Sequence, residues 1–331
     1  MVRARSLWIV AALACRGARP DERAGHGGAE ESGASAEDSG GDPSGGDPDT
    51  AALDGVPPTE ADGRWTFRSD ALVLEVDPAV GGRVTALTHD GVALLTGPAT
   101  DSDNYGATFW TSPQSGWGWP PPAAIDTAPY TVRLDGATLV LGSGAADVHG
   151  GKITVEKAIA VREDVVTQRY TVTNVGVTDV SLAGWQVARV PSGGLTVFPA
   201  GDHVTTTLGS LSYVEEGGAV WVAETPIADA KVIADGSGGF VAHVTGGVLL
   251  RVDATDIATA DVAPGEGEVE IFARGGGGYV EIEHQGPYTT LVPGAEMVWD
   301  VRWTVATLPA DVDVGVGSAS LLAFLVDGDK T

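Results

Sequence analysis

The feature that most constrains the fold is a succession of short strand-like segments that fills the chain from Arg64 onward. These segments carry alternating or β-branched apolar residues, as in 71–76 (ALVLEV) and 298–305 (VWDVRWTV). Turn pairs such as Asp90-Gly91 separate them. Helical periodicity is confined to 318–326. Many short strands without intervening helices predict an all-β chain, with antiparallel sheets packed as a large β-sandwich.

The amino terminus has the composition of an export signal. Arg3 and Arg5 form a basic end, 7–13 form an apolar stretch, and small residues lead to Cys15. The apolar stretch is far shorter than the roughly twenty residues that span a bilayer. The sequence therefore predicts a signal peptide over 1–15, an exported chain, and no transmembrane helix.

Cys15 is the only cysteine, which excludes an intramolecular disulfide and a zinc-thiolate cluster. A cysteine directly after the small residue Ala14 resembles the bacterial lipoprotein processing site, which implies a lipid at Cys15 and a cell-envelope location. Residues 12–14 also suit ordinary signal peptidase. A soluble secreted or periplasmic protein is the alternative.

Composition divides the rest of the chain into a linker over 16–62 and a globular domain over 63–331. The linker repeats Ser-Gly-Gly-Asp-Pro, lacks aromatic residues, and holds twelve acidic residues against three arginines. The net charge of −26 argues against nucleic acid and against direct binding to anionic lipid. We therefore expect a saccharide or another small neutral ligand, and membrane contact only through a lipid anchor. No sequence motif predicts a metal site, and we expect no cofactor.

Residues 104–122 (NYGATFWTSPQSGWGWPPP) place Trp110, Trp117 and Trp119 close together on a glycine- and proline-rich segment. Indole rings usually lie in a core, so this segment predicts either a loop packed over one end of the sandwich or an apolar platform. Such a platform suits a sugar, which has apolar C–H faces and hydroxyl edges. The sequence leaves both interpretations open.

The order of several short segments resembles the galactose mutarotase-like (aldose 1-epimerase-like) supersandwich superfamily, and within it a bacterial family of unknown function. The resemblance spans about 65 to 309. The segments are 77–87 (DPAVGGRVTAL) followed by Asp90-Gly91, then 157–161 (KAIAV), 169–174 (RYTVTN), and Pro293-Gly294 before the strand with Trp299 and Trp303. The resemblance implies long antiparallel sheets and a sugar-related role.

Aldose mutarotation needs an acid and a base, and the superfamily supplies them as a histidine and a glutamate. Where mutarotases carry a histidine motif, this chain reads 182–189 (LAGWQVAR). No mutarotase catalytic residue therefore transfers directly. The remaining catalytic candidates are Glu281, Glu283 and His149.

Strand alternation nominates a ligand-binding face, because every second residue of a strand points the same way. Lys157 interrupts an apolar row, Trp185 shares a face with Arg189, and Glu281 shares one with Glu283. We expect these side chains to converge on one cleft bordered by the tryptophan segment. The alternative is an ion pair between Lys157 and one glutamate in a surface sheet. The expected ligand-binding residues are Gln114, Trp117, Trp119, Lys157, Trp185, Arg189 and Arg83.

Three classes of function remain open. The first is a lipid-anchored carbohydrate-binding protein that is not clearly catalytic. The second is an aldose epimerase or mutarotase-like enzyme with non-standard acid and base residues. The third is a structural surface protein whose tryptophan segment belongs to its core.

Overall fold

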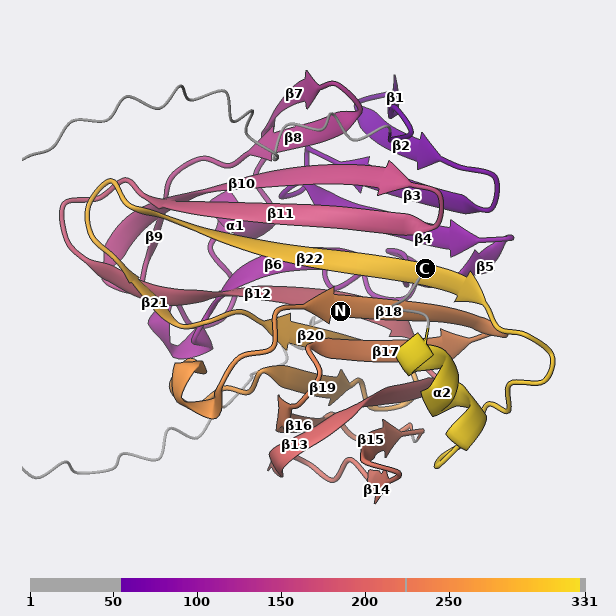
Figure 1. The fold of residues 1–331 in the computed structure, drawn as a ribbon. Coiled ribbons are helices and arrows are strands. Elements are labelled where there is room, and N and C mark those ends of the chain that lie inside the picture. The colour runs from indigo at the N-terminus through magenta and orange to yellow at the C-terminus, as the bar shows by residue number, and fades with distance from the viewer. Residues whose placement is uncertain (1–54, 224, 328–331) are drawn as a thin grey trace, which may run out of the picture. The chain divides into compact units, whose positions relative to one another are not determined.

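The computed structural model describes residues 55–223 and 225–327. Within them the chain forms two layers of antiparallel strands, one in front of the other in Figure 1. The predicted all-β class and large antiparallel sandwich are therefore confirmed. The predicted signal peptide, Cys15 and residues 16–54 of the predicted linker lie outside the described residues.

Sheet A forms one layer, and antiparallel pairing gives the order of its strands. They are β1 (Thr59–Ala61), β2 (Arg64–Arg68), β3 (Leu72–Asp77), β4 (Arg83–His89), β6 (Ala107–Ser112), β12 (Val180–Pro191), β20 (Tyr279–Gln285), β19 (Val269–Ala273), β16 (Ala230–Gly236) and β13 (Leu195–Leu208). Two short strands extend this layer: β5 (Val92–Ala93) pairs with β4, and β21 (Thr289–Leu291) pairs with β12.

Sheet B forms the other layer. Its strands are β7 (Thr131–Asp135), β8 (Thr138–Gly142), β10 (Gly151–Arg162), β11 (Val165–Asn174), β22 (Glu296–Thr307), β18 (Val248–Ala254), β17 (Phe240–Thr245), β13, β15 (Ala219–Val222) and β14 (Val214–Glu216). The short β9 (Ala146–Val148) pairs with the start of β10.

The long strand β13 belongs to both layers. Its first half pairs with β15 and β17 of sheet B, and its second half pairs with β16 of sheet A. The register shifts between Ala200 and Val204, where the strand passes from one sheet to the other. This shared strand ties the two layers together at one side.

Helical structure is short in the described residues. It comprises η1 (Gln114–Gly116), α1 (Ala123–Asp126), η2 (Thr259–Asp261) and α2 (Ala319–Asp327). The helix expected over 318–326 is α2. Its residues Leu321 and Leu325 are buried with Trp221 and Phe240 in a small cluster separate from the main core.

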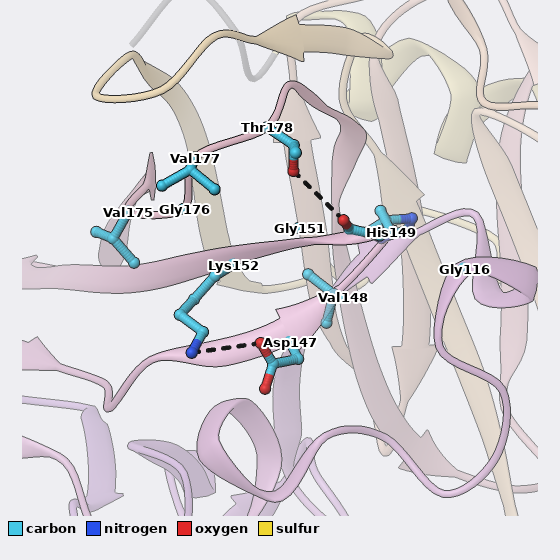
Figure 2. Close-up of a pocket in the computed structure, with 11 residues that line it drawn as sticks. Gly116, Asp147, Val148, His149, Gly151, Lys152, Val175, Gly176, Val177 and Thr178 are labelled. Carbon is cyan, nitrogen blue, oxygen red and sulfur yellow. Dashed lines mark hydrogen bonds and ion pairs between the residues drawn. The ribbon is translucent and has the colours of Figure 1, made fainter.

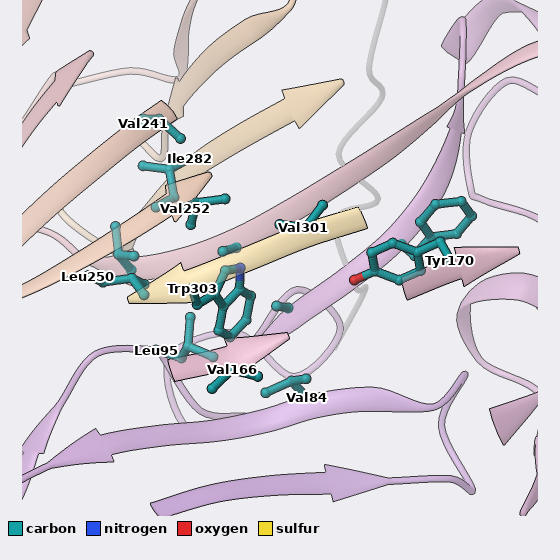
Figure 3. Close-up of a cluster of buried hydrophobic side chains, with 14 of the residues drawn as sticks. Val84, Leu95, Val166, Tyr170, Val241, Leu250, Val252, Ile282, Val301 and Trp303 are labelled. Carbon is teal, nitrogen blue, oxygen red and sulfur yellow. The ribbon is translucent and has the colours of Figure 1, made fainter. Parts of the chain in front are cut away.

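The main core lies between the sheets, where the inward-facing half of each alternating strand is apolar. Figure 3 shows Trp303 of β22 with Leu95, Val166 and Val84 gathered around it. Burying one such Val or Leu side chain contributes about 1.5–3 kcal/mol. This packing makes the two layers a rigid support for side chains on the opposite faces of the sheets.

The globular domain begins earlier than the predicted boundary at residue 63. Thr59–Ala61 pair with β2, and the Val56 amide donates a hydrogen bond to the Val161 carbonyl at 2.8 Å. The linker composition misled the prediction because an edge strand with both faces exposed needs no apolar residues.

Candidate functional site

The candidate site lies on the outer face of sheet A, the face turned away from sheet B. Along β12 the side chains alternate, and Gln186 faces sheet B, where it accepts a hydrogen bond from Trp303 Nε1 at 2.7 Å. Trp185, Val187 and Arg189 therefore point to the outer face. A separate buried cluster of Trp110, Trp185 and Val187 confirms this orientation.

Strand register brings polar residues from neighbouring strands together on this outer face. Trp185 lies opposite Trp110 of β6, and Arg189 lies opposite Glu281 of β20. Glu283 of β20 lies opposite Glu270 of β19. With Lys231 from β16, these side chains form what we call the outer-face cluster: Trp110, Trp185, Arg189, Lys231, Glu270, Glu281 and Glu283.

Arg189 and Glu281 form an ion pair at one end of the cluster. The Arg189 Nε and Glu281 Oε1 atoms are 2.8 Å apart, and the Arg189 side chain is 1% exposed. The guanidinium lies 5.2 Å from the centre of the Trp110 ring, and Arg189 Nη1 also donates to Thr108 Oγ1. Packing against an indole and pairing with a carboxylate hold this guanidinium in one orientation.

Lys231 occupies the other end of the cluster between two carboxylates. Its Nζ is 3.1 Å from Glu283 Oε2 and in close contact with Glu270 Oε2. It also lies 5.1 Å from the centre of the Trp185 ring. Trp185 Nε1 donates to Glu283 Oε2 at 2.9 Å. The second oxygen, Glu283 Oε1, is buried without a hydrogen-bond partner.

Burial shifts the protonation of the acids around Lys231. It raises the pKa of Glu283 to about 8, although the Lys231 ammonium acts in the opposite direction. Burial and the neighbouring Glu270 also raise the pKa of Glu266 to about 8. Glu266 Oε1 accepts the Gln114 amide hydrogen at 2.8 Å, which connects the cluster to the tryptophan segment. The site thus contains two carboxyl groups whose burial favours the protonated form.

The tryptophan segment combines both expected roles. The Trp110 ring is buried and meets the Trp185 ring edge-on at 5.3 Å. Trp117 packs 6.0 Å from Trp110 and donates its indole hydrogen to the Thr111 carbonyl at 2.6 Å. Trp119, in contrast, is 44% exposed while its ring meets that of Trp110 edge-on at 5.9 Å. Two of the rings are therefore packed, and the third presents apolar surface to solvent.

Arg83 lies beside the cluster at the start of β4 and is almost fully buried. Its Nη2 contacts Asp126 of α1 at 3.4 Å, and its Nη1 donates to the Asp103 carbonyl at 2.9 Å. Asp126 also accepts the Trp110 indole hydrogen at 2.8 Å. Burial lowers the pKa of Arg83, while Asp126 acts in the opposite direction. Arg83 therefore supports the cluster through Asp126 and Trp110.

Lys157 does not share this face, so its predicted convergence with Arg189 in one cleft is wrong. It points from β10 of sheet B toward the interior, where its ammonium donates to the Gly81 carbonyl at 2.7 Å and to that of Gly82. It lies 5.0 Å from the centre of the Tyr130 ring. The alternative, an ion pair between Lys157 and a surface glutamate, is also wrong, because the Lys157 ammonium donates its hydrogen bonds to backbone carbonyls.

The turn at Gly81 explains why Lys157 finds carbonyls there. Gly81 has φ +67°, and a Cβ at this position would lie 2.1 Å from the Asp126 carbonyl oxygen. Only glycine allows this close approach, which fixes the β3–β4 turn with its carbonyls available to Lys157.

His149 lies outside the outer-face cluster, in the turn between β9 and β10. Its Nε2 is 3.0 Å from Thr111 Oγ1, and burial lowers its pKa to about 4. The imidazole is therefore neutral at physiological pH and hydrogen-bonded within the fold. Nothing in this arrangement gives it a proton to transfer to a ligand on the outer face.

Sequence reasoning missed Lys231, Glu266 and Glu270. Lys231 alternates with the buried Ala230 and Val232, and Glu270 alternates with Val269 and Ile271, so the polar positions were visible as one face of each strand. Which strands lie side by side was not visible, because β12, β20, β19 and β16 are far apart in the chain.

In the parts of the chain that the structure describes, no group of three or more His, Cys, Asp or Glu side chains is arranged to hold a metal ion. Over 55–223 and 225–327, no helix has the length and apolar character needed to cross a membrane.

The class of protein defined by this architecture is a two-layered antiparallel supersandwich with a polar, tryptophan-lined face. No family model matches the chain, and no curated protein matches it in sequence. Solved structures do match its fold. A galactose mutarotase-like protein from Lactobacillus casei ATCC 334 aligns with a TM-score of 0.55 at 11% identity, over 74% of this chain and 100% of its own.

Two further structures give the same result. The Slr1438 protein from Synechocystis sp. PCC 6803 aligns with a TM-score of 0.53 at 13% identity, over 76% of this chain and 97% of its own. A putative aldose 1-epimerase from Klebsiella pneumoniae subsp. pneumoniae MGH 78578 aligns with a TM-score of 0.53 at 10% identity, over 81% and 83%. The chain therefore has the galactose mutarotase-like fold.

Proposed function

We propose that this protein binds a saccharide at the outer-face cluster, beside Trp119. The observation that carries the proposal is Glu283 Oε1, a buried carboxyl oxygen without a hydrogen-bond partner, on a side chain that contacts Trp185 and Lys231. A sugar ring supplies a hydroxyl for this acceptor and apolar C–H faces for indole rings. The chain shares its fold with a galactose mutarotase-like protein and a putative aldose 1-epimerase, which supports the same ligand class.

The cluster is exposed only at its margin. The side chains of Lys231 and Glu281 are 19% and 13% exposed, whereas those of Glu270 and Glu283 are almost fully buried. A ligand would meet Lys231, Glu281 and the exposed Trp119 ring first. The three cationic groups nearby, Arg83, Arg189 and Lys231, each contact a carboxylate, which favours a neutral ligand over an anionic one.

A glycan array followed by isothermal titration calorimetry tests this proposal. The purified chain should bind at least one neutral saccharide. Glu283→Leu, which removes the acceptor oxygen, should weaken that binding, whereas Glu296→Leu, at an exposed position on β22 of the other sheet, should not. Binding that is equal in both variants, or no binding on the array, would contradict the proposal and leave a structural surface protein.

A second candidate function is acid–base catalysis of aldose mutarotation or epimerisation. The observation that favours it is the pair of carboxyl groups, Glu266 and Glu283, whose pKa values are each raised to about 8. In mutarotation a base removes the anomeric hydroxyl proton, an acid protonates the ring oxygen, and the ring C–O bond breaks and re-forms. Polarimetry of fresh α-D-glucose and α-D-galactose would detect it, and a rate unchanged by the protein would exclude these substrates.

We also propose that the chain is exported and carries lipid at Cys15. The support is the sequence alone: a basic end, a short apolar stretch, and a cysteine after Ala14. Mass spectrometry of the amino terminus of the mature protein tests this. An unmodified Cys15, or cleavage beyond it, would contradict the lipid anchor.

A further inference from the structure

A second concave site adjoins the tryptophan segment at Gly116. It is a pocket of about 690 Å³, which is the size of small-molecule sites in proteins. The β9–β10 hairpin forms one wall, the loop between β11 and β12 forms another, and Gly116 of the tryptophan segment closes one end (Figure 2). We call it the hairpin pocket.

The lining of the hairpin pocket combines hydrogen-bonding groups with small apolar surfaces. Lys152 and Asp147 reach across the hairpin with Nζ and Oδ1 3.5 Å apart, and both side chains remain largely exposed (Figure 2). Thr178 adds a hydroxyl, while Val175 and Val177 are 45% and 92% exposed. Donors, acceptors and apolar patches of this size suit a ligand that carries hydroxyls on an apolar ring.

The charges in the pocket do not favour an ionic ligand. The Lys152 ammonium is paired with Asp147, and burial lowers the pKa of His149 to about 4, so that its ring is neutral. A phosphate or a carboxylate beside Lys152 would also lie beside the negative Asp147 carboxylate, which repels it. A neutral polyol meets no such repulsion.

The shape of the pocket is fixed by packing and does not depend on a ligand. A Cβ at Gly116 would lie 2.0 Å from His149 Nδ1, and a Cβ at Gly151 would lie 2.1 Å from Val180 Cγ2. These two glycines are therefore required for the loop and the hairpin to approach each other. The close approach at these two points holds this part of the pocket in place without a ligand, which reduces the entropic cost of binding.

The hairpin pocket and the outer-face cluster are held together through Thr111. The Thr111 carbonyl accepts the Trp117 indole hydrogen, and its hydroxyl is 3.0 Å from His149 Nε2. The His149 amide also donates to the Gly116 carbonyl at 3.1 Å. Gly116 lines the pocket, whereas the next residue, Trp117, packs against Trp110 of the cluster. A residue that lines the pocket is thus directly followed in the chain by a residue that packs against the cluster.

We propose that the ligand is an oligosaccharide, with one sugar unit at the outer-face cluster and a further unit of the same chain in the hairpin pocket. The inference rests on the proposed saccharide binding and specifies its ligand class. A free monosaccharide would leave the pocket empty. A chain of several units would contact both sites and gain affinity from the second.

The test is calorimetry with two ladders of probes: glucose with cellobiose and cellotetraose, and galactose with β-1,4-galactobiose and β-1,4-galactotetraose. In at least one ladder, affinity should rise at least tenfold from the monosaccharide to the tetrasaccharide. Thr178→Trp, which fills the pocket, and Asp147→Ala, which removes an exposed acceptor, should reduce this gain without changing monosaccharide affinity. Thr178→Trp adds a large side chain to the pocket wall. Asp147→Ala adds no volume and therefore tests the pocket independently.

Asp300→Ala is the matched control, since Asp300 forms an exposed ion pair with Arg169 on sheet B. It should retain the full gain. Monosaccharide binding without a gain in either ladder, or a gain that persists in both pocket variants, would overturn the inference and leave the proposed function intact. If no probe of any length binds, the inference fails, and the glycan array decides the proposed function separately.

Discussion

Arg189 Nε lies 2.8 Å from Glu281 Oε1, and both residues come from adjacent strands in direct register. The guanidinium is buried and rests against the Trp110 ring, whereas the Glu281 side chain keeps 13% exposure. Arg189 therefore fixes the carboxylate at the margin of the outer-face cluster, where a ligand would enter. The same burial makes the pair important for stability.

Replacement of Arg189 should destabilise the fold as well as the site. Arg189→Ala leaves Glu281 without its cation, and breaking a buried pair in this way costs about 3–5 kcal/mol of unfolding free energy. Chemical denaturation measures this. The control is Arg169→Ala, which breaks an exposed pair with Asp300 of similar length and should cost less than about 1 kcal/mol. Equal losses in both variants would show that burial of Arg189 is not the cause.

Trp119→Ala should reduce saccharide affinity about five- to tenfold, or about 1–1.4 kcal/mol, because it removes an aromatic surface beside the cluster. Since this side chain is 44% exposed, the melting temperature should change little. Calorimetry with the best array ligand gives the affinity. Val298→Ala removes an exposed apolar side chain from sheet B and should have no effect on binding.

Lys157→Met should leave saccharide affinity unchanged, because Lys157 faces the interior between the sheets and its amine is held by the Gly81 and Gly82 carbonyls. The loss of these two hydrogen bonds should cost about 1–3 kcal/mol of stability. Parallel calorimetry and urea denaturation separate the two effects. A loss of saccharide affinity larger than the loss of stability accounts for would show that Lys157 contributes to ligand binding.

The fold followed from the sequence because alternation, turn pairs and the lack of helical periodicity all indicate the same architecture. Side chains alternate along a strand with a period of two residues, and this alternation also predicted two polar strand faces. One carries Trp185 and Arg189, and the other carries Glu281 and Glu283. Lys157 shows the limit of that argument. The sequence pattern marked Lys157 as a polar exception in an apolar row. Only the structure of the β3–β4 turn shows which carbonyl groups accept its hydrogen bonds.

The pairing between strands that are distant in the chain could not be predicted from the sequence either. Lys231 and Glu283 meet because β16, β19 and β20 lie in one sheet, and no local pattern specifies that order. The orphaned Glu283 Oε1 and the raised pKa of Glu266 follow from this pairing and from burial. Local residues thus predict a face, whereas tertiary contacts determine its chemistry.

Removal of β1 should destabilise the domain. A chain beginning at Asp62 lacks Thr59–Ala61 and the Val56 hydrogen bond to Val161, which exposes the edge of β2. A chain beginning at Gly55 retains both. We expect the shorter chain to melt a few degrees lower, roughly the shift that 1 kcal/mol produces in a domain of this size. Identical melting curves would show that β1 adds no stability.

Stability should fall as pH rises through the neutral range. Burial raises the pKa of Glu283 and that of Glu266 from 4.5 to about 8, so the folded chain retains protons that the unfolded chain has released. The resulting contribution to folding is full below about pH 4.5 and is lost progressively as pH approaches 8. Urea denaturation at intervals from pH 5 to 9 measures the decline.

Glu283→Gln separates this effect from general charge repulsion. The net charge of −26 also destabilises the compact state as acids ionise, but a single exposed substitution changes that term little. Because glutamine mimics the protonated carboxyl group, Glu283→Gln should flatten the decline between about pH 5 and 8. Glu296→Gln, at an exposed position, should keep the slope of the unsubstituted chain. If both variants follow the same curve, Glu283 does not carry the proton that the folded state retains.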